Sequence, residues 1–515
     1  VLDVGTLYTQ GRTPSGAPTE PRRLAREHGA GLVVAGNYYR SRDSIYFSAN
    51  IVGVENGRVL RSLDPVGGPV QDPMPAIDEV RQRVTAALAS LLDPRAGSFT
   101  GAEAQPPRYA AYQEFITGQE MHWRGAFEQS MAHFRRAVEL DSSFASASLW
   151  LGVAAVAAVR CDVADSVHLA LAPHLDRLTE TERLTRGITA ARCATDPGEE
   201  HRLHRERAAR NPGSSYSRWG LGMSARKAGR PAEALSVLRA IEPERDLGWL
   251  ADPVFYWRDL TGAQHALGDH RGELKSAQRF ARAGPPRLAA SYFAARALAG
   301  AGRPDEALRA LDGADRLPPD PVLVAQQLSS HRMRARRLAT PGWVMYQSAT
   351  ELLAHGHPSA ARQAAERAVR WVRSRPPQEA GSPEHRWVLA LALDLLGRHP
   401  EAAALAAGLV AGDSANVDYR GTLGVVAAHR ADTAAARRIA RWLAARPARH
   451  PAGLPGLYRA RIAAVLGEHG RALALLEALP HGGHPMVEIL LFHSDPALGA
   501  LRGNPRFEAF IRPRG

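Results

Sequence analysis

One short pattern recurs along most of the chain, and it restricts the fold more than any other feature of the sequence. A glycine is followed five residues later by an alanine and then by leucines, as in "KAGRPAEALSVL" with Gly229 and Ala234. The other occurrences are at Gly302 with Ala307, Gly356 with Ala361, Gly397 with Ala402, Gly467 with Ala472, Gly268 without an alanine, and Ala431, which replaces the glycine. Self-similarity of this kind predicts a repeat architecture.

Each position of the pattern has a physical reason. Glycine lets the first helix of a unit end in a left-handed turn, because it carries no Cβ that would clash. Alanine lets the second helix approach the first, and a bulky side chain there would cost about 1–3 kcal/mol. The groove between hairpins is expected to be filled by Leu235, Leu238, Leu308 and Leu311. The pattern therefore predicts stacked helical hairpins, none of which can bury its apolar flank alone.

The spacing resembles that of the tetratricopeptide family, whose repeat is about 34 residues. Gly118 and Gly152 lie 152 − 118 = 34 residues apart, as do Gly268 and Gly302, with 302 − 268 = 34. The resemblance implies a mostly α fold, a right-handed α-solenoid over residues 109–490 with roughly eight to ten repeats. We expect irregularities at 160–212, read as a helical pair without the usual glycine, and at 318–340, where an extra helix is expected.

The end of the chain differs from the repeats. The stretch "FHSDPALGALRGNPRFEAFIRP" (Phe492–Pro513) resembles the segment that closes tetratricopeptide arrays in bacterial signalling proteins. The resemblance implies that residues 491–515 form capping helices, because a terminal repeat must cover its exposed apolar side. The expected buried face consists of Leu498, Leu501, Phe507, Phe510 and Ile511.

Residues 1–92 have the pattern of a small α/β domain. Ser44–Val54 alternates between apolar and polar residues, which is typical of a strand with one buried face. Asn56-Gly57 predicts a two-residue hairpin turn. Further strands are expected at Val1–Tyr8, Leu32–Arg40 and Arg58–Leu63, and helices at Arg22–His28 and Pro75–Leu92. The second helix should pack on the sheet through Ile77, Val80, Val84, Leu88 and Leu91. Residues 93–108 have no periodicity and are predicted to be a linker.

The stretch "RRLAREHGAGLVVAGNYYRSRDSIYFSANIVGVENGRVL", followed by "AIDEVRQRVTAAL", resembles the TolB-like domain of bacterial signalling proteins. The resemblance covers about residues 1–92 and implies only the latter part of that domain. Such a domain typically stands between a Ser/Thr kinase, cyclase or DNA-binding output domain and a tetratricopeptide array, as in transmembrane kinases and transcriptional regulators. We therefore expect the chain to be part of a longer protein, with a catalytic domain or membrane anchor upstream.

The charge balance gives 65 − 52 = +13, and the pI is near 10.3. A basic excess suits nucleic acid or an anionic membrane. Here, however, the excess is arginine spread along the chain and interleaved with acidic residues, so arginine-mediated nucleic-acid binding is kept only as an alternative. No apolar run is long enough to span a membrane. We expect a soluble bacterial protein, or the soluble part of a membrane-tethered one, in the cytoplasm or periplasm.

Cys161 and Cys193 form neither a disulfide framework nor a zinc set. They are expected to be buried or half-buried thiols, and a single bridge stays open. His481 and His484 lack a third ligand, so no metal and no cofactor are predicted. His201 and His204 are read as part of a solvated helix face. "WRDL" at Trp257–Leu260 lacks the other elements of a kinase catalytic loop. No catalytic residues are found, and the chain is predicted not to be an enzyme.

The expected function is a protein-interaction scaffold or sensor module of a signalling protein. A protein or peptide partner would lie in the concave groove lined by the first helix of each hairpin. Aromatic residues and arginine anchor interfaces most often, and arginine can fork onto a carboxylate. The candidate groove residues are Trp219, Arg226, Arg258, Tyr292, Arg296, Tyr346 and Trp387. Two alternatives stay open: the aromatic residues pack between hairpins, or the chain is the non-catalytic region of a kinase or cyclase.

Overall fold

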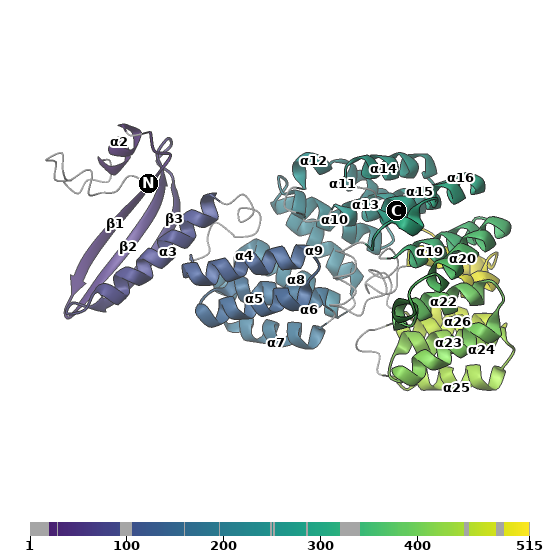
Figure 1. Cartoon of the computed structure of the whole chain (residues 1–515). Helices are drawn as coiled ribbons and strands as arrows, with labels where there is room; N and C mark the ends of the chain where they lie inside the picture. Colours follow the sequence, from purple (N-terminus) through teal and green to yellow (C-terminus); the bar gives the residue numbers. More distant parts are fainter. Residues whose placement is uncertain are drawn as a thin grey trace. The chain divides into compact units, whose positions relative to one another are not determined.

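The structure is a computed structural model. It describes residues 20–27, 29–92, 106–158, 160–194, 196–247, 250, 253–284, 287–319, 340–446, 453–479 and 489–513. The described residues divide into two compact units. The first lies within Val1–Gln119, Ser130–Leu151 and Val167–Arg183, and the second within Glu120–Gln129, Gly152–Ser166 and Leu184–Gly515. Figure 1 shows the elements of both units along the chain.

The amino-terminal region contains a three-stranded antiparallel sheet in the order β1-β2-β3. Its strands are β1 (Leu32–Ser41), β2 (Ser44–Gly53) and β3 (Val59–Pro69), and α2 (Glu20–Glu27) precedes them. Ala49 and Ile51 on one face of β2 are buried, as the alternation predicted. Val52 pairs with Val59, so the turn at Asn56-Gly57 is longer than the predicted two residues. The predicted strand at Val1–Tyr8 lies outside the described residues.

Helix α3 (Met74–Leu92) packs against β2 and β3, as expected. Of the predicted apolar stripe, Val80, Val84, Leu88 and Leu91 are half-buried and only Ile77 is exposed, at 38%. The fully buried residues of the helix are Ala76, Ala86 and Ala87. The helix lies close to the sheet at its first turn, where a Cβ built on Gly68 of β3 would lie 2.9 Å from the Cβ of Ala76. Of the predicted linker, only residues 106–108 are described.

Helices follow from residue 109: α4 (Tyr109–Trp123), α5 (Phe127–Leu140), α6 (Ala145–Ala157), α7 (Cys161–Leu171), η2 (Ala172–Arg177), α8 (Glu180–Cys193) and α9 (Pro197–Arg210). Gly118 and Gly152 lie inside α4 and α6, and Gly125 makes the bend after α4 with a φ of +79°. Gly118 is needed for packing, because a Cβ there would lie 2.8 Å from the ring of Phe134. In the irregular span 160–212, α8 and α9 are the expected helical pair without the usual glycine, and α7 and η2 precede them.

The two cysteines are bonded to each other. Cys161 begins α7, Cys193 ends α8, and their Cα atoms lie 5.7 Å apart across the disulfide. The expectation of two free thiols was therefore wrong, and the single bridge that the sequence left open is present. Spacing alone could not show this, because the pairing depends on how α7 and α8 meet.

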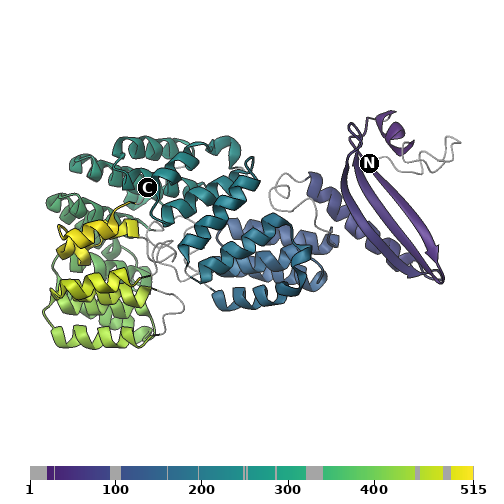
Figure 2. The same cartoon turned by 180° about the vertical axis from the view of Figure 1, so that it is seen from behind.

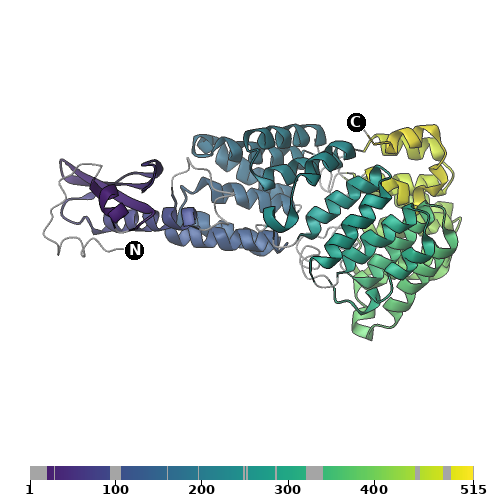
Figure 3. The ribbon, with the colours of Figure 1, turned by 90° about the horizontal axis from the view of Figure 1, so that it is seen from above.

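The second unit contains a series of antiparallel helix pairs. The pairs are α10 (Ser215–Lys227) with α11 (Pro231–Arg239), α13 (Val254–Ala266) with α14 (His270–Arg282), α15 (Leu288–Gly300) with α16 (Pro304–Ala310), α19 (Pro341–Ala354) with α20 (Pro358–Arg373), α22 (Pro383–Leu395) with α23 (His399–Gly412), α24 (Val417–His429) with α25 (Thr433–Ala444), and α26 (Leu454–Val465) with α27 (His469–Glu477). Short elements α12 (Pro243–Asp246), η3 (Ala314–Arg316) and α21 (Pro377–Ala380) connect some of them. Figures 2 and 3 show the pairs stacked side by side as an α-solenoid.

The predicted bends lie where the pattern placed them. Gly229, Gly268, Gly302, Gly356, Gly397 and Gly467 each separate the two helices of a pair and have φ between +70° and +82°. Ala431 takes the same role between α24 and α25 with a φ of +57°. The alanines five residues after the glycines are all buried. The hairpin prediction is thus confirmed for these seven pairs. The extra helix expected within 318–340 falls almost wholly outside the described residues.

The chain ends in η4 (Ile489–Ser494), η5 (Pro496–Leu501) and α28 (Pro505–Ile511). Leu498, Leu501 and Phe507 are buried in the core of the second unit, and Phe510 and Ile511 pack against that core half-buried. η5 contacts α26 and α19, so the carboxy-terminal segment reaches back along the first helices of the hairpins. Among the described helices, none is both long enough and apolar enough to cross a bilayer.

Candidate functional site

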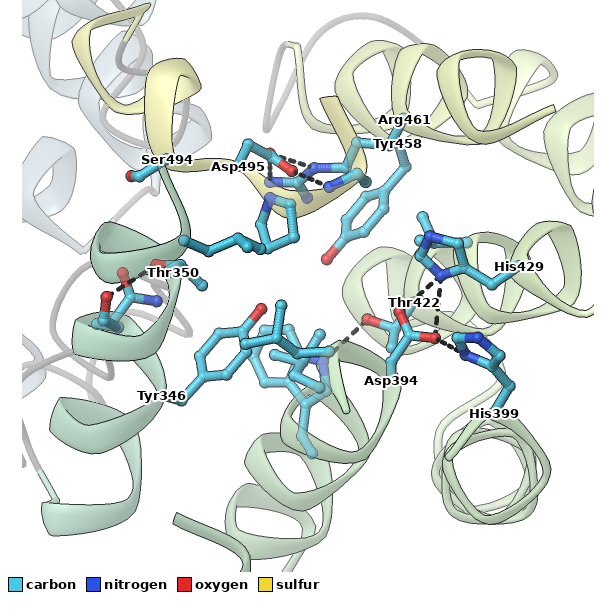
Figure 4. Close-up of a pocket in the computed structure, with 18 of the residues that line it drawn as sticks. Tyr346, Thr350, Asp394, His399, Thr422, His429, Tyr458, Arg461, Ser494 and Asp495 are labelled. Carbon is cyan, nitrogen blue, oxygen red and sulfur yellow. Dashed lines mark hydrogen bonds and ion pairs between the residues drawn. The ribbon is translucent and has the colours of Figure 1, made fainter. Parts of the chain in front are cut away.

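A cavity of about 390 Å³ lies on the wall formed by the first helices of four consecutive hairpins, α19, α22, α24 and α26 (Figure 4). Its floor is aromatic and aliphatic: Trp343, Tyr346, Trp387, Leu391, Val425 and Tyr458. One side is formed by Ser494–Ala497, which belong to the carboxy-terminal segment. A concave, mostly apolar cavity with a few polar groups is the usual form of a ligand site.

The floor of the cavity is held in place by its own contacts. Trp387 is fully buried, and its indole nitrogen donates a hydrogen bond to Thr422 Oγ1 at 3.0 Å. Its ring meets the ring of Trp343 edge-on, with 5.3 Å between centroids. The Tyr458 hydroxyl donates to Asp418 at 3.0 Å, and burial, followed by the charge of Asp418, raises the pKa of this hydroxyl well above its usual value. The floor therefore presents fixed, uncharged surfaces to a ligand.

A polar group stands at the opposite edge of the cavity. The Asp394 carboxylate accepts hydrogen bonds from His399 Nδ1 at 2.9 Å and from His429 Nδ1 at 3.0 Å. The two imidazole rings stack with 5.1 Å between their centroids. The three ligand atoms are close enough to share a metal ion. Direct hydrogen bonds account equally well for this arrangement, because the carboxylate lies between two imidazole donors.

Arg461 provides the positive charge of the cavity. Its guanidinium binds the Asp495 carboxylate through two nitrogens, at 2.6 and 2.7 Å, and it lies 4.8 Å from the centroid of the Tyr458 ring. Burial would lower the pKa of Arg461, but Asp495 raises it above its usual value. A carboxylate from the carboxy-terminal segment is thus bound to an arginine of the wall, and both nitrogens bond the same oxygen, Oδ2.

Comparison with known families finds a similarity for part of this wall. Residues 346–417, which extend from α19 through α23, match the tetratricopeptide repeat model. This segment is similar to a tetratricopeptide repeat. It contributes the Tyr346, Trp387 and Asp394 side chains to the cavity. No curated protein matches the chain.

Solved structures with similar helical folds include a tetratricopeptide repeat protein from Parabacteroides merdae, with 10% identity and a TM-score of 0.27 over 58% of this chain and 91% of that chain. A Rap protein complexed with competence and sporulation factor has 12% identity and a TM-score of 0.29, and the match covers 65% of this chain and 96% of the Rap chain. A chain of the Cut9–Hcn1 hetero-tetramer of the APC/C has 13% identity and a TM-score of 0.35, and the match covers 86% of this chain and 84% of that chain. With scores under 0.5, none superposes on this chain as a whole.

The structure places two of the seven candidate groove residues at the cavity. Tyr346 and Trp387 line it, next to Trp343 and Tyr458. Trp219, Arg226, Arg258, Tyr292 and Arg296 lie on α10, α13 and α15 instead. Partner binding by any of the seven stays a prediction.

Two of these arginines are buried in ion pairs with the chain itself. Arg226 binds Asp259 of α13 at 2.9 Å, and Arg296 binds Glu273 of α14 at 2.6 Å. These carboxylates belong to neighbouring helices of the chain: two nitrogens of Arg226 bond the same oxygen of Asp259, and Arg296 donates through Nε to Glu273 Oε1. The predicted fork onto a partner's carboxylate stays a prediction. Arg258 is half-buried and lies 3.4 Å from Asp259, and the Tyr292 hydroxyl donates to Glu351 at 3.3 Å.

Sequence reasoning missed two groups of buried histidines. His201 and His204, predicted to be solvated, are buried, because α9 packs against α10 and His201 bonds the Ser224 hydroxyl at 3.1 Å. The second group joins His265, Glu351, His355 and His493 from three elements. Burial would raise the pKa of Glu351, but His493 and the other positive neighbours hold it below its usual range. The one local signal was the spacing of Glu351 and His355, one helical turn apart.

Proposed function

We propose that the chain is a protein-interaction scaffold that binds a short peptide segment in the cavity of α19, α22, α24 and α26. The observation that carries this proposal is the chain's own Ser494–Ala497 segment, the junction of η4 and η5, which lines the cavity with Asp495 bound to Arg461. A wall that holds a short segment of its own chain has the surface chemistry needed for another peptide.

The cavity favours a peptide with one large apolar or aromatic anchor. The floor formed by Trp343, Tyr346 and Trp387 is rigid and largely apolar. Burying such an anchor in a fixed pocket is how a few residues supply most of the energy of an interface. The polar edge at Asp394 and Arg461 would then fix the direction of the peptide.

A peptide selection tests this function. A random peptide library displayed on phage is panned against the purified full chain, and the selected peptides are measured by calorimetry. Gln347→Trp fills the cavity from a half-buried lining position. Gln363→Trp is the matched control, because Gln363 is exposed on α20, the second helix of the same hairpin.

We expect Gln347→Trp to weaken binding at least tenfold and Gln363→Trp to leave it unchanged. A selection that yields no binding peptide, or peptides that bind Gln347→Trp as tightly as the natural chain, would count against the proposal.

The signalling context is part of the same proposal. It rests on the TolB-like resemblance of residues 1–92, with a linker at 93–108, repeats over 109–490 and a cap over 491–515. In this arrangement the chain would be the sensory or docking region of a longer protein, and a kinase or cyclase domain would lie upstream. The coding sequence before Val1 decides this point.

The disulfide supports one of the two expected compartments. Disulfides persist in oxidising environments such as the bacterial periplasm and are rare in the reducing cytoplasm. The bond between Cys161 and Cys193 therefore favours a periplasmic location for this part of the protein.

A further inference from the structure

Four side chains from three elements of the second unit converge on one point. His265 comes from the end of α13, Glu351 and His355 from one face of α19, and His493 from η4. His265 and Glu351 are buried, and the other two are half-buried. The ligand atoms are three imidazole Nε2 atoms and Glu351 Oε2, all within 4.8 Å of one another.

The distances between these atoms fit the edges of a zinc tetrahedron. Zn–N and Zn–O bonds of 2.0–2.2 Å give ligand-to-ligand edges of about 3.3–3.6 Å. From His265 Nε2 the distances are 3.2 Å to His493, 3.4 Å to His355 and 3.6 Å to Glu351. From Glu351 Oε2 they are 3.0 Å to His493 and 4.0 Å to His355. The sixth edge, between His355 and His493, is at most 4.8 Å, and His355 would have to move toward the other three ligands to complete the tetrahedron.

The hydrogen bond that His265 makes through Nδ1 determines which of its two ring nitrogens can bind a metal. Its Nδ1 lies 2.8 Å from the Glu273 carboxylate. When Nδ1–H donates there, Nε2 of the neutral ring keeps its lone pair and points it at the centre of the cluster. A carboxylate behind a ligating histidine is the usual outer partner of a zinc ligand. Without a cation, His265 Nε2 and Glu351 Oε2 would be two acceptors facing each other.

Glu273 is a carboxylate at a position where the other hairpins have a small apolar residue. It follows the turn Gly268 by five residues, where the other hairpins have a buried alanine. Glu273 is fully buried and also accepts a hydrogen bond from Arg296 at 2.6 Å. The outer partner is thus itself held in position, and Arg296 balances its charge. Glu351 is likewise oriented by the Tyr292 hydroxyl.

We infer that His265, Glu351, His355 and His493 form a tetrahedral zinc site that fastens the carboxy-terminal segment to α13 and α19. Three nitrogens and one carboxylate favour zinc over calcium or magnesium, which bind oxygen ligands. Four protein ligands close the coordination sphere, so the site is structural rather than catalytic. His270, which lies 3.5 Å from Glu273, and Arg502, which donates to the His493 carbonyl oxygen, face the cluster without being ligands.

The site would also fix one side of the cavity, since His493 directly precedes Ser494–Ala497. This consequence rests on the proposed function, whereas zinc uptake does not. A zinc measurement therefore tests the site whether or not a peptide binds.

The experiment uses the untagged full chain, stripped of metal with a chelator and titrated with Zn²⁺ against a chromophoric competitor. We expect one tightly bound Zn²⁺ per chain, and Co²⁺ in its place should give the intense visible absorption of a tetrahedral ion. His355→Ala and His493→Ala should each weaken Zn²⁺ binding at least a hundredfold. His429→Ala is the matched control, because it removes a ligand of the Asp394, His399 and His429 group instead.

Because His355→Ala and His493→Ala lie on separate elements, a folding defect in one variant would not explain a loss of Zn²⁺ binding in both. Circular dichroism checks the helix content of each variant. Absence of Zn²⁺ uptake by the natural chain would overturn the site and favour a cluster held by a protonated His265. Loss of uptake in His429→Ala but not in His355→Ala or His493→Ala would move the metal to the other group and equally overturn the inference.

Discussion

Single residues with a left-handed backbone conformation determine the bends between paired helices. Gly302 has a φ of +72°, and a Cβ built there would meet no atom within 4 Å. Its preference for glycine is therefore purely conformational. Ala431 holds the equivalent position with a φ of +57°, which a side chain rarely adopts. Substitutions at the two sites can therefore measure how much the left-handed backbone conformation contributes to the free energy of unfolding.

Exchanging the two residue types should have opposite effects on stability. Gly302→Ala should lower the free energy of unfolding by about 1 kcal/mol, because alanine resists the left-handed region. Ala431→Gly should raise it by up to about 1 kcal/mol, since the strain of the alanine exceeds the added chain entropy of glycine. Amide hydrogen exchange of α15 and α24 in each variant measures the local effect. Equal signs for the two substitutions would contradict this account of the bends.

These residue-scale features were predictable from the sequence because they follow a local rule. A glycine at a bend and an alanine five residues later are read directly from neighbouring positions. The ion pairs are different, because Arg226 and Asp259 lie 33 residues apart and meet only when adjacent hairpins stack. The arginines were correctly expected on first helices, but their actual partners could not be identified before the stacking was known.

At the scale of elements, helices α7 and α8 are joined by a disulfide and have no glycine in the bend between them. The disulfide joins residues separated by 32 positions, in the span where the repeat pattern fails. The sequence predicted this irregularity and the helical pair α8 and α9 within it, but not the bridge between α7 and α8, because no local pattern shows that the two cysteines meet. The turn at Asn56-Gly57 was also misjudged, since the ladder of β2 and β3 ends before those residues.

Removing the disulfide should destabilise this region locally. Cys161→Ser should cost about 3–4 kcal/mol, the usual value for a loop of this length. Because a repeat array does not unfold as one unit, faster hydrogen exchange is expected in α7 and α8, with α24 unaffected. The natural chain should show no free thiol when denatured without reductant. A reactive thiol in that assay, or unchanged exchange in the variant, would contradict the role given to the bond.

At the scale of the whole molecule, the carboxy-terminal segment forms one side of the cavity on the first helices. The contact of His493 with His265 joins residues 228 positions apart. The resemblance to a terminal cap predicted that the segment would bury Leu498, Leu501 and Phe507, but no sequence pattern shows which helices it crosses. The cavity could not be predicted for the same reason, although two of its residues, Tyr346 and Trp387, were among the candidates.

The central claim is that partners bind on the wall of α19, α22, α24 and α26. Hydrogen exchange measured by mass spectrometry, with and without a peptide from the phage selection, tests it most directly. The account predicts slower exchange in these four first helices and in Ser494–Ala497, with little change in α20, α23 and α25. Slower exchange confined to those second helices or to the amino-terminal sheet, despite measured binding, would contradict it.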